Sequence, residues 1–161
     1  MSRNATVRVL GIDPGYDRCG VAIVERANSG ETLLWSDCLT PAKGDFCTRL
    51  LELGKSIDAL LTKWRPNAVA CEKIFFTRNQ KTGIAVAELR GVIRYLTTKN
   101  KLPFYEYTPQ EIKRAVTGYG NADKAQVETM VRVLLLMEDV KRHDDEYDAV
   151  ATALTALPSL R

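Results

Sequence analysis

The sequence of 161 residues lacks the cysteine and histidine patterns that hold structural zinc. It has four cysteines, Cys19, Cys38, Cys47 and Cys71, and none of them belongs to a Cys-x-x-Cys pair. The single histidine, His143, is far from all four in the chain. These spacings predict neither a zinc site nor a disulfide framework, so we expect buried, reduced thiols.

Long apolar runs are missing as well. No stretch approaches the roughly 20 apolar residues that cross a membrane, and the N-terminus has no signal-peptide core. Hydrophobic content of 45% and charged content of 27% are typical of a globular protein. A chain of 161 residues is too short for two substrate-clasping lobes. We therefore expect one domain over residues 1–161, in the cytoplasm and without membrane contact.

The net charge of +3 is unevenly distributed along the chain. Residues 73–124 contain ten Lys and Arg but four Asp and Glu, so this segment carries +6 and the rest carries −3. A basic segment in a chain with acids elsewhere favours a polyanionic partner. An ordinary solvated helix face would explain part of the same charge.

The first apolar run, residues 7–13, ends in Asp13-Pro14-Gly15. A short β-branched run predicts a buried strand, and Pro and Gly stop it. Asp13 then lies at the carboxyl end of a strand, where a covered carboxylate needs a metal ion or several donors. The alternative is that Asp13 only caps the turn.

The remaining patterns predict an α/β fold. Residues 19–24 and 31–39 are expected to form a three-strand antiparallel meander with the first strand. Residues 68–72 and 104–107 are further strands, and the former should run parallel to the first because it returns after a helix. Helices are predicted at 46–63, 81–99, 109–117, about 123–137 and about 145–157.

Apolar spacing also indicates which helix faces pack inward. In the helix at 81–99 a packing seam is expected from Ile84, Ala87, Gly91 and Tyr95. In the helix ending near residue 137, Leu134 is expected to face the core.

Three more acids join Asp13. Glu72 ends the strand at 68–72, and the carboxyl ends of parallel strands are where open α/β sheets bind ligands. Asp145 and Asp148 are three residues apart at the start of the last helix, which puts both on one face. Four acids without soft ligands suit Mg²⁺ or Mn²⁺, and two such ions roughly 3.5–4 Å apart can hydrolyse a phosphodiester. Taken alone, Asp145 and Asp148 are better explained as helix-capping and solvated first-turn acids.

Six stretches, in chain order, carry a resemblance to a known family. They are Gly11-Ile12-Asp13-Pro14-Gly15, Glu72-Lys73-Ile74-Phe75-Phe76, Glu88-Leu89-Arg90-Gly91-Val92, Tyr107-Thr108-Pro109, Gly118-Tyr119-Gly120-Asn121-Ala122-Asp123-Lys124 and Asp144-Asp145-x-x-Asp148-Ala149. With the sheet order and the acids, they resemble the RuvC family of Holliday junction resolvases in the RNase H-like nuclease superfamily. The resemblance implies a five-stranded mixed sheet, a meander plus parallel strands, with helices on both faces.

The resemblance also implies an activity. Asp13, Glu72, Asp145 and Asp148 would be the metal-binding catalytic acids of an endonuclease that resolves four-way (Holliday) junction DNA by symmetric cuts in recombination and repair. Mg²⁺ would be the cofactor, two ions per site, with Mn²⁺ as the alternative. A homodimer and a branch-migration helicase complex of the RuvA and RuvB type would be its partners.

Basic and aromatic residues receive roles by the same resemblance. Lys113 and Lys124 would act beside the acids, and Phe75 would stack on bases at the opened junction centre. Further DNA contacts are expected from Arg78, Asn79, Lys81 and Arg114. For the homodimer, small residues at four-residue steps, Gly83, Ala87 and Gly91, would let a partner helix approach closely.

Several alternatives stay open. Phe75 can be a core residue and Lys124 a tolerated surface lysine, although a cation in the first turn of a helix opposes its dipole. Asp144 is a fifth acid that can replace Asp145 as a ligand, and the bulky Glu146-Tyr147 departs from the small residues of many relatives.

Two functions from other classes compete with the nuclease. Asp13-Pro14-Gly15 is also similar to the phosphate loop of actin-like ATPases and sugar kinases, which need a second lobe. A non-catalytic junction-binding scaffold is the other reading, and the intact set of four acids argues against it.

Overall fold

The computed structural model describes residues 6–74, 80–138 and 140–160. Phe75, Arg78 and Asn79, three of the expected DNA contacts, lie outside these residues. Lys81 belongs to a helix, but its side chain is also outside the described part of the structure.

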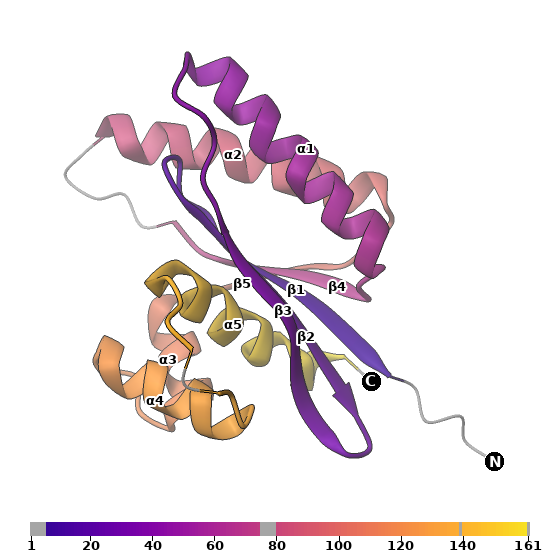
Figure 1. Cartoon of the computed structure of the whole chain (residues 1–161), viewed down its shortest axis with the longest axis vertical. Helices are drawn as coiled ribbons and strands as arrows, with labels where there is room; N and C mark the ends of the chain where they lie inside the picture. Colours follow the sequence, from indigo (N-terminus) through magenta and orange to yellow (C-terminus); the bar gives the residue numbers. More distant parts are fainter. Residues whose placement is uncertain (1–5, 75–79, 139, 161) are drawn as a thin grey trace.

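A five-stranded mixed sheet forms the centre of the described chain (Figure 1). Its strands are β1 (Val7–Asp13), β2 (Cys19–Ala27), β3 (Gly30–Leu39), β4 (Ala68–Glu72) and β5 (Phe104–Tyr107). Their spatial order is β3-β2-β1-β4-β5, with β2 antiparallel to its neighbours β1 and β3, and with β4 and β5 parallel to β1. The predicted meander and the predicted parallel strands are both confirmed.

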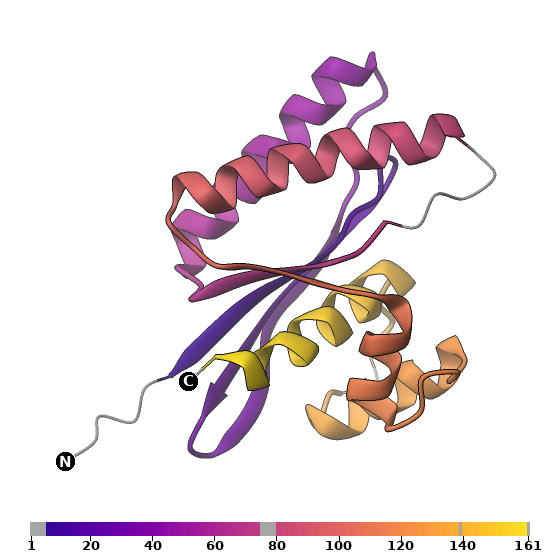
Figure 2. The same cartoon turned by 180° about the vertical axis from the view of Figure 1, so that it is seen from behind.

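Helices cover both faces of this sheet, as Figures 1 and 2 show. The upper layer consists of α1 (Phe46–Trp64) and α2 (Gln80–Lys99). The lower layer consists of α3 (Pro109–Thr117), α4 (Lys124–Leu134) and α5 (Asp144–Ala156), followed by the 3-10 turn η1 (Leu157–Ser159). No helix among the described residues combines the length and the apolar content that a membrane crossing requires.

The alternation of side chains along β1 divides the core in two. Leu10 and Ile12 pack with α1 and α2, whereas Val9 belongs to the cluster under α5. Because successive side chains of a strand point to opposite faces, Gly11 and Asp13 lie on the α5 side with Val9. The end of β1 therefore presents its carboxylate to the lower layer.

Capping residues set the helix boundaries largely as the sequence predicts. Thr108 accepts a hydrogen bond from the Glu111 N–H, and the Glu111 carboxylate accepts one from the Thr108 N–H, which starts α3. Asp123 and Gln126 form the same reciprocal pair at α4. Gly118, with φ of 78°, ends α3 in the left-handed conformation that glycine adopts without strain.

Two predictions about helix faces are wrong. The inward face of α2 is made by Leu89, Ile93 and Leu96, whereas the expected seam residues Ile84 and Tyr95 are 57% and 67% exposed. Leu134 is also largely exposed.

The helix α4 ends earlier than the expected residue 137. The residue Leu136 has φ of 47°, a left-handed backbone that stops the helix beyond Leu134.

Candidate active site

Asp13 and Glu72 end two neighbouring parallel strands. In the ladder between β1 and β4, Ile12 pairs with Cys71, so the next residues along both strands, Asp13 and Glu72, come side by side. Cys71 packs in the upper cluster, which places Glu72 on the lower face with Asp13. The parallel pairing of β1 and β4 thus brings both carboxylates together at the carboxyl ends of the strands, as the sequence predicts.

The N-terminal end of α5 supplies the other two acids from the lower layer. A Cβ on Gly11 would lie 2.1 Å from the Ala149 carbonyl oxygen, and one on Gly20 would lie 1.8 Å from the Asp145 carbonyl oxygen. Any side chain at these two glycines would push the helix off the sheet. Because Gly20 pairs directly with Asp13 in the β1–β2 ladder, the close approach puts Asp145 beside the end of β1.

Mutual repulsion among the acids is visible in their proton affinities. The pKa of Asp13 is raised to about 7, first by burial and then by the charges of Asp148, Glu72 and Asp145 in that order of strength. Burial followed by the charge of Asp148 also raises the pKa of Glu72. The four predicted acids therefore share one electrostatic site, and a divalent cation would relieve their repulsion.

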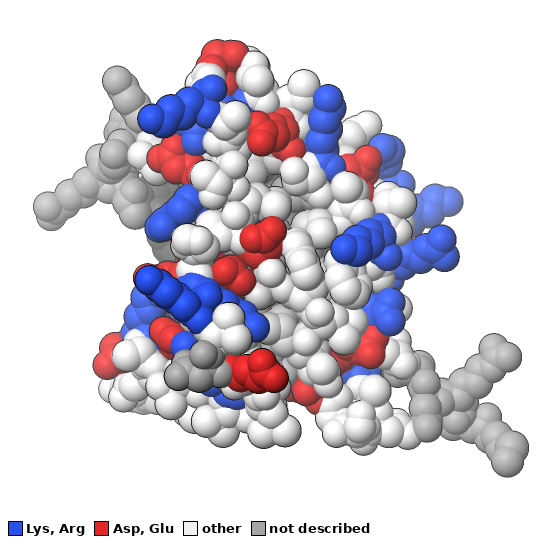
Figure 3. Space-filling view, viewed as in Figure 1, with Lys and Arg blue, Asp and Glu red and all other residues white. Residues whose placement is uncertain are grey.

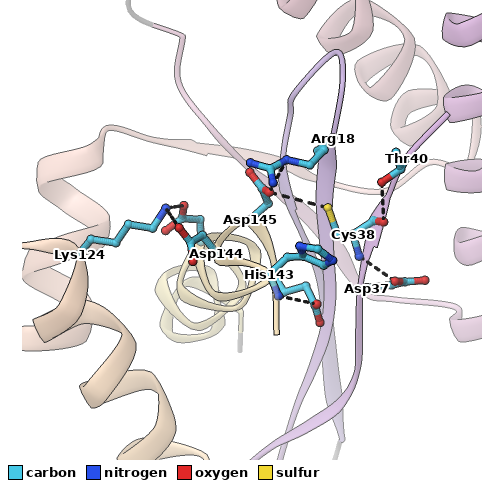
Figure 4. Close-up of polar contacts among 10 residues, drawn as sticks. Arg18, Asp37, Cys38, Thr40, Lys124, His143, Asp144 and Asp145 are labelled. Carbon is cyan, nitrogen blue, oxygen red and sulfur yellow. Dashed lines mark hydrogen bonds and ion pairs between the residues drawn. The ribbon is translucent and has the colours of Figure 1, made fainter. Parts of the chain in front are cut away.

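Two cations now neutralise part of this charge (Figure 4). The Lys124 ammonium lies 3.2 Å from Asp148 Oδ2 and 3.3 Å from Asp144 Oδ2. Burial lowers the pKa of Lys124, but the carboxylates of Asp148 and Asp144 outweigh that effect and raise it. On the other side of α5, Arg18 Nε lies 3.2 Å from Asp145 Oδ2.

A thiol approaches the same oxygen of Asp145. Cys38 Sγ on β3 lies 3.7 Å from Asp145 Oδ2, which accepts its weak hydrogen bond (Figure 4). Burial and the charge of Asp145 raise the pKa of Cys38, so this thiol stays protonated and donates. Arg18 and Cys38 together hold Asp145 toward the β1–β2 turn and the end of β3.

The placement of the fifth acid favours Asp145 over Asp144 in the site. The side chain of Asp145 is 19% exposed, whereas that of Asp144 is 67% exposed. Asp145 is also among the charges that raise the pKa of Asp13 most.

The bulky pair between the two aspartates does not enter the site. Glu146 accepts hydrogen bonds from the Ser36 hydroxyl, at 2.7 Å, and from the His143 N–H, at 3.0 Å. Tyr147 is buried in the lower core, with the Arg132 guanidinium 5.3 Å from its ring centroid. Both side chains therefore leave the spacing of Asp145 and Asp148 unobstructed.

Two clefts meet at Glu72. One, of about 240 Å³, is lined by Glu72 and Asp148 together with Lys113 and Lys124. The other, of about 200 Å³, is lined by Asp13, Pro14 and Glu72 and reaches the first turn of α2. Figure 3 shows basic side chains beside acidic ones on the left of that view, where the lower layer carries α4 and the start of α5.

Only some of the expected basic residues that the structure describes lie beside the acids. Lys113 and Lys124 lie at the acids, in agreement with the sequence. Arg114 is exposed on α3 beside the Gly120 turn and does not line either cleft at Glu72. Two cations were missed: Arg18, in a turn without a helical or strand pattern, and Arg90, whose presence in the Glu88–Val92 stretch was the available signal.

The donor set fits a hard divalent cation. All four side chains offer carboxylate oxygens, and the raised pKa values of Asp13, Glu72 and Asp148 indicate negative charge that bound cations would compensate. Among the described residues no three acidic, cysteine or histidine side chains already converge as a ligand set. Lys124 and Arg18 hold oxygens of Asp148 and Asp145 in ion pairs instead.

The sequence matches a family described as crossover junction endodeoxyribonuclease RuvC over residues 9–156. A curated protein of that name from Moorella thermoacetica is 45% identical over 148 residues, which are 91% of this chain and 88% of the relative. Another from Syntrophomonas wolfei is 41% identical over 157 residues, covering 96% and 91% of the two chains.

Solved structures of Holliday junction resolvases also match this chain. A structure described as T. thermophilus RuvC in complex with Holliday junction substrate matches with a TM-score of 0.86 and 30% identity, over 92% of each chain. The yeast mitochondrial Holliday junction resolvase Ydc2 matches with a TM-score of 0.69 over 92% of this chain and 77% of its own. At 16% identity, that second match is a likeness of fold alone.

Proposed function

The chain belongs to the RuvC family of crossover junction endodeoxyribonucleases, and from this premise we propose that it resolves four-way DNA junctions by symmetric phosphodiester hydrolysis in recombination and repair. The observation that carries the proposal is the convergence of acids from β1, β4 and α5 beside two lysines from α3 and α4. The structural similarity to a RuvC bound to junction substrate supports the choice of DNA.

We propose Asp13, Glu72, Asp145 and Asp148 as ligands of two Mg²⁺ ions, with Mn²⁺ as the alternative. Bound there, the ions would activate a water molecule and stabilise the leaving oxygen of the phosphodiester. Asp13 and Glu72 hold their oxygens at the ends of two neighbouring strands, facing the acids of α5, and the low exposure of Asp145 limits competing water. Ion binding requires Asp13 to release the proton that its raised pKa retains near neutral pH.

The two lysines would act on the phosphate. The Lys124 ammonium reaches the acids from the first turn of α4, where it opposes the helix dipole. Lys113 lines the same cleft from α3. Positive charge held there stabilises the negative charge that develops on the phosphate oxygens in the transition state.

We further propose that Phe75 stacks on a base freed at the junction centre, because it follows Glu72 closely in the chain. Arg78, Asn79 and Lys81 follow in the same stretch, and Arg114 lies on the exposed side of α3. Replacing Phe75 by alanine should weaken junction binding by on the order of 1–3 kcal/mol and leave linear duplex binding nearly unchanged. Equal losses on both DNA forms would contradict stacking at the crossover.

A homodimer would supply the two equal sites that symmetric cutting of a two-fold junction requires. The face of α2 with Ile84, Ala87, Gly91 and Tyr95 is exposed, and the space that a side chain on Gly91 would occupy is open. Sedimentation showing only an 18.0 kDa species with full activity would refute the dimer. A branch-migration helicase of the RuvA and RuvB type and a cytoplasmic location, where chromosomal DNA is processed, complete the proposal.

The decisive experiment is cleavage of a synthetic four-way junction with Mg²⁺ and with EDTA, alongside linear duplex of the same sequence. We expect paired nicks in the junction with Mg²⁺ alone. Asp13→Asn should remove cleavage and keep junction binding within a few fold, because metal chemistry and phosphate contacts are separable. Junction binding without cutting by the wild-type protein would instead identify a non-catalytic scaffold.

A further inference from the structure

A buried arginine contacts the backbone of Glu72 from the α2 side of the sheet. Arg90, on α2, has a side chain that is 9% exposed. Its guanidinium donates to the backbone carbonyl of Glu72, lies 3.5 Å from Cys71 Sγ, and forms an ion pair with Glu106 on β5. One side chain therefore ties the ends of β4 and β5 to the upper helical layer.

The burial of this charge calls for a reason beyond packing. Arg90 is the single Lys or Arg that is buried in the described part of the chain. Removing a guanidinium from water costs free energy unless its donors find partners, and an apolar side chain would fill the space without that cost. The planar fork of arginine can bind two acceptors at fixed directions, and here the acceptors belong to two strands.

The carbonyl that Arg90 binds is the last of β4. In the parallel ladder Cys71 pairs with Glu106 and Glu72 pairs with Tyr107, and the N–H of Lys73 donates to the Tyr107 carbonyl at 2.8 Å. After that bond the chain leaves the sheet. Arg90 therefore holds the carbonyl of the last peptide of β4, whose N–H, from Lys73, is held by the Tyr107 carbonyl of β5.

We propose that Arg90 is a positioning residue that sets the direction of the Glu72 carboxylate for cation binding. The inference rests on the proposed metal-dependent function. Arg90 contacts the backbone of Glu72 from the α2 side, whereas the Glu72 side chain faces the clefts shared with Asp13 and Asp148. It acts on the ligand through its backbone and does not touch the substrate.

The chain offers a matched control on the same helix. Arg94, one turn after Arg90, binds the other oxygen of Glu106 at 2.9 Å, and its side chain is 57% exposed. It makes no hydrogen bond to β4 among those found in the described residues. Losing Arg94 removes a cation from Glu106 but leaves Glu72 untouched.

The test measures Mn²⁺ binding by calorimetry well below the unfolding temperature, with junction nicking as a second readout. Arg90→Met should weaken Mn²⁺ binding by about 10-fold to 100-fold, the usual loss when a residue that orients a metal ligand is removed. Arg90→Lys should also weaken Mn²⁺ binding, because one ammonium cannot bind acceptors on β4 and β5 in the fixed directions of a guanidinium. Arg94→Met should bind Mn²⁺ as the wild type does.

A double-mutant cycle separates positioning from general destabilisation. Glu72→Gln removes the ligand, and adding Arg90→Met to it should cause little further loss of Mn²⁺ affinity. Equal losses from Arg90→Met in the presence and absence of the Glu72 carboxylate would overturn the proposal. So would wild-type Mn²⁺ affinity in a folded Arg90 variant.

Glu106→Gln decides the matter if the Arg90 variants do not fold. This change preserves the shape of the side chain at position 106 and weakens its ion pair with Arg90. Mn²⁺ affinity should therefore also fall, by a smaller factor than in Arg90→Met. Wild-type affinity in Glu106→Gln would then overturn the proposal. Failure of the wild type to nick junctions would refute the proposed function, whereas the Mn²⁺ affinities would still report on Arg90.

Discussion

Gly20 on β2 lies directly against the backbone of Asp145, so that a Cβ at position 20 would be 1.8 Å from the Asp145 carbonyl oxygen. The same glycine pairs with Asp13 across the β1–β2 ladder. A missing side chain on a neighbouring strand is therefore what brings an acid of α5 to an acid of β1.

Gly20→Ala should displace the start of α5 and separate the acids. The new methyl group would meet backbone atoms of Asp145, which cannot rotate away, so we expect a loss of on the order of 1–3 kcal/mol in stability. Nicking should fall more than the residual folded fraction explains, because Asp145 moves with the helix. Urea unfolding and single-turnover nicking of four-way junctions measure the two effects.

Gly44→Ala is the matched control, because nothing lies within 4 Å of a Cβ at Gly44. It should leave stability and nicking at the wild-type values. Wild-type activity in Gly20→Ala would show that the close approach to α5 is dispensable.

Strand positions and strand-end acids could be predicted because they depend on local patterns. The Asp13-Pro14-Gly15 break and the short apolar run before Glu72 each end a strand, and parallel pairing aligns such ends. Two acids at a helix start share a face wherever that helix lies. Burial and packing then placed all four in one electrostatic site.

Contacts that depend on tertiary placement were not predictable in the same way. The inward face of α2 is Leu89, Ile93 and Leu96, and a second apolar spacing through Ile84 and Tyr95 competes with it in the sequence. Hydrophobic periodicity does not distinguish a face that meets the sheet from one that meets solvent or another chain. Arg18 and Arg90 have long side chains whose partners, Asp145 and Glu106, lie far away in the chain.

The stability of the metal-free protein should fall as pH rises from about 4 to about 7. The pKa of Asp13 is raised to about 7 from its ordinary value of 3.8, so the folded protein keeps a proton that the unfolded chain has already released. Over that range the folded state binds more protons, and each rise in pH favours unfolding. The raised pKa values of Glu72 and Asp148 act in the same direction.

Asp13→Asn provides the comparison for this pH dependence. Because the amide does not titrate, the variant should be more stable than the wild type in EDTA near pH 8, and the difference should shrink near pH 5. Urea unfolding at several pH values measures it. A difference that stays constant or grows toward low pH would contradict a raised pKa at Asp13.

Lys124→Met should slow nicking more than it weakens junction binding. The ammonium lies 3.2 Å from Asp148 at the mouth of the cleft, where it can stabilise charge that develops only in the transition state. We expect a loss of about 10²-fold in single-turnover rate and a loss of affinity below about tenfold at one fixed salt concentration. Lys43→Met, on an exposed loop, is the control of equal charge. Equal losses of rate and affinity would show that Lys124 acts only as a phosphate contact.

Arg18→Met should strengthen divalent cation binding, in contrast to the loss of a carboxylate ligand. The Arg18 guanidinium and a bound cation compete for Asp145 Oδ2, which lies 3.2 Å from Arg18 Nε. Because the arginine side chain is more than half exposed, its ion pair is worth about 0.2–1 kcal/mol, so the gain in Mn²⁺ affinity should reach at most about fivefold.

Calorimetric titration of Mn²⁺ into the DNA-free protein tests this competition, with Arg18→Lys as the variant that retains the charge. The lysine variant should bind Mn²⁺ nearly as the wild type does, since its ammonium can still reach a carboxylate from the same turn. Raising the salt concentration should narrow the difference between Arg18→Met and wild type, because screening weakens an exposed ion pair. Weaker Mn²⁺ binding in Arg18→Met would show instead that Arg18 holds Asp145 in the ligating position, so that the ion pair prepares the site for the cation and does not compete with it.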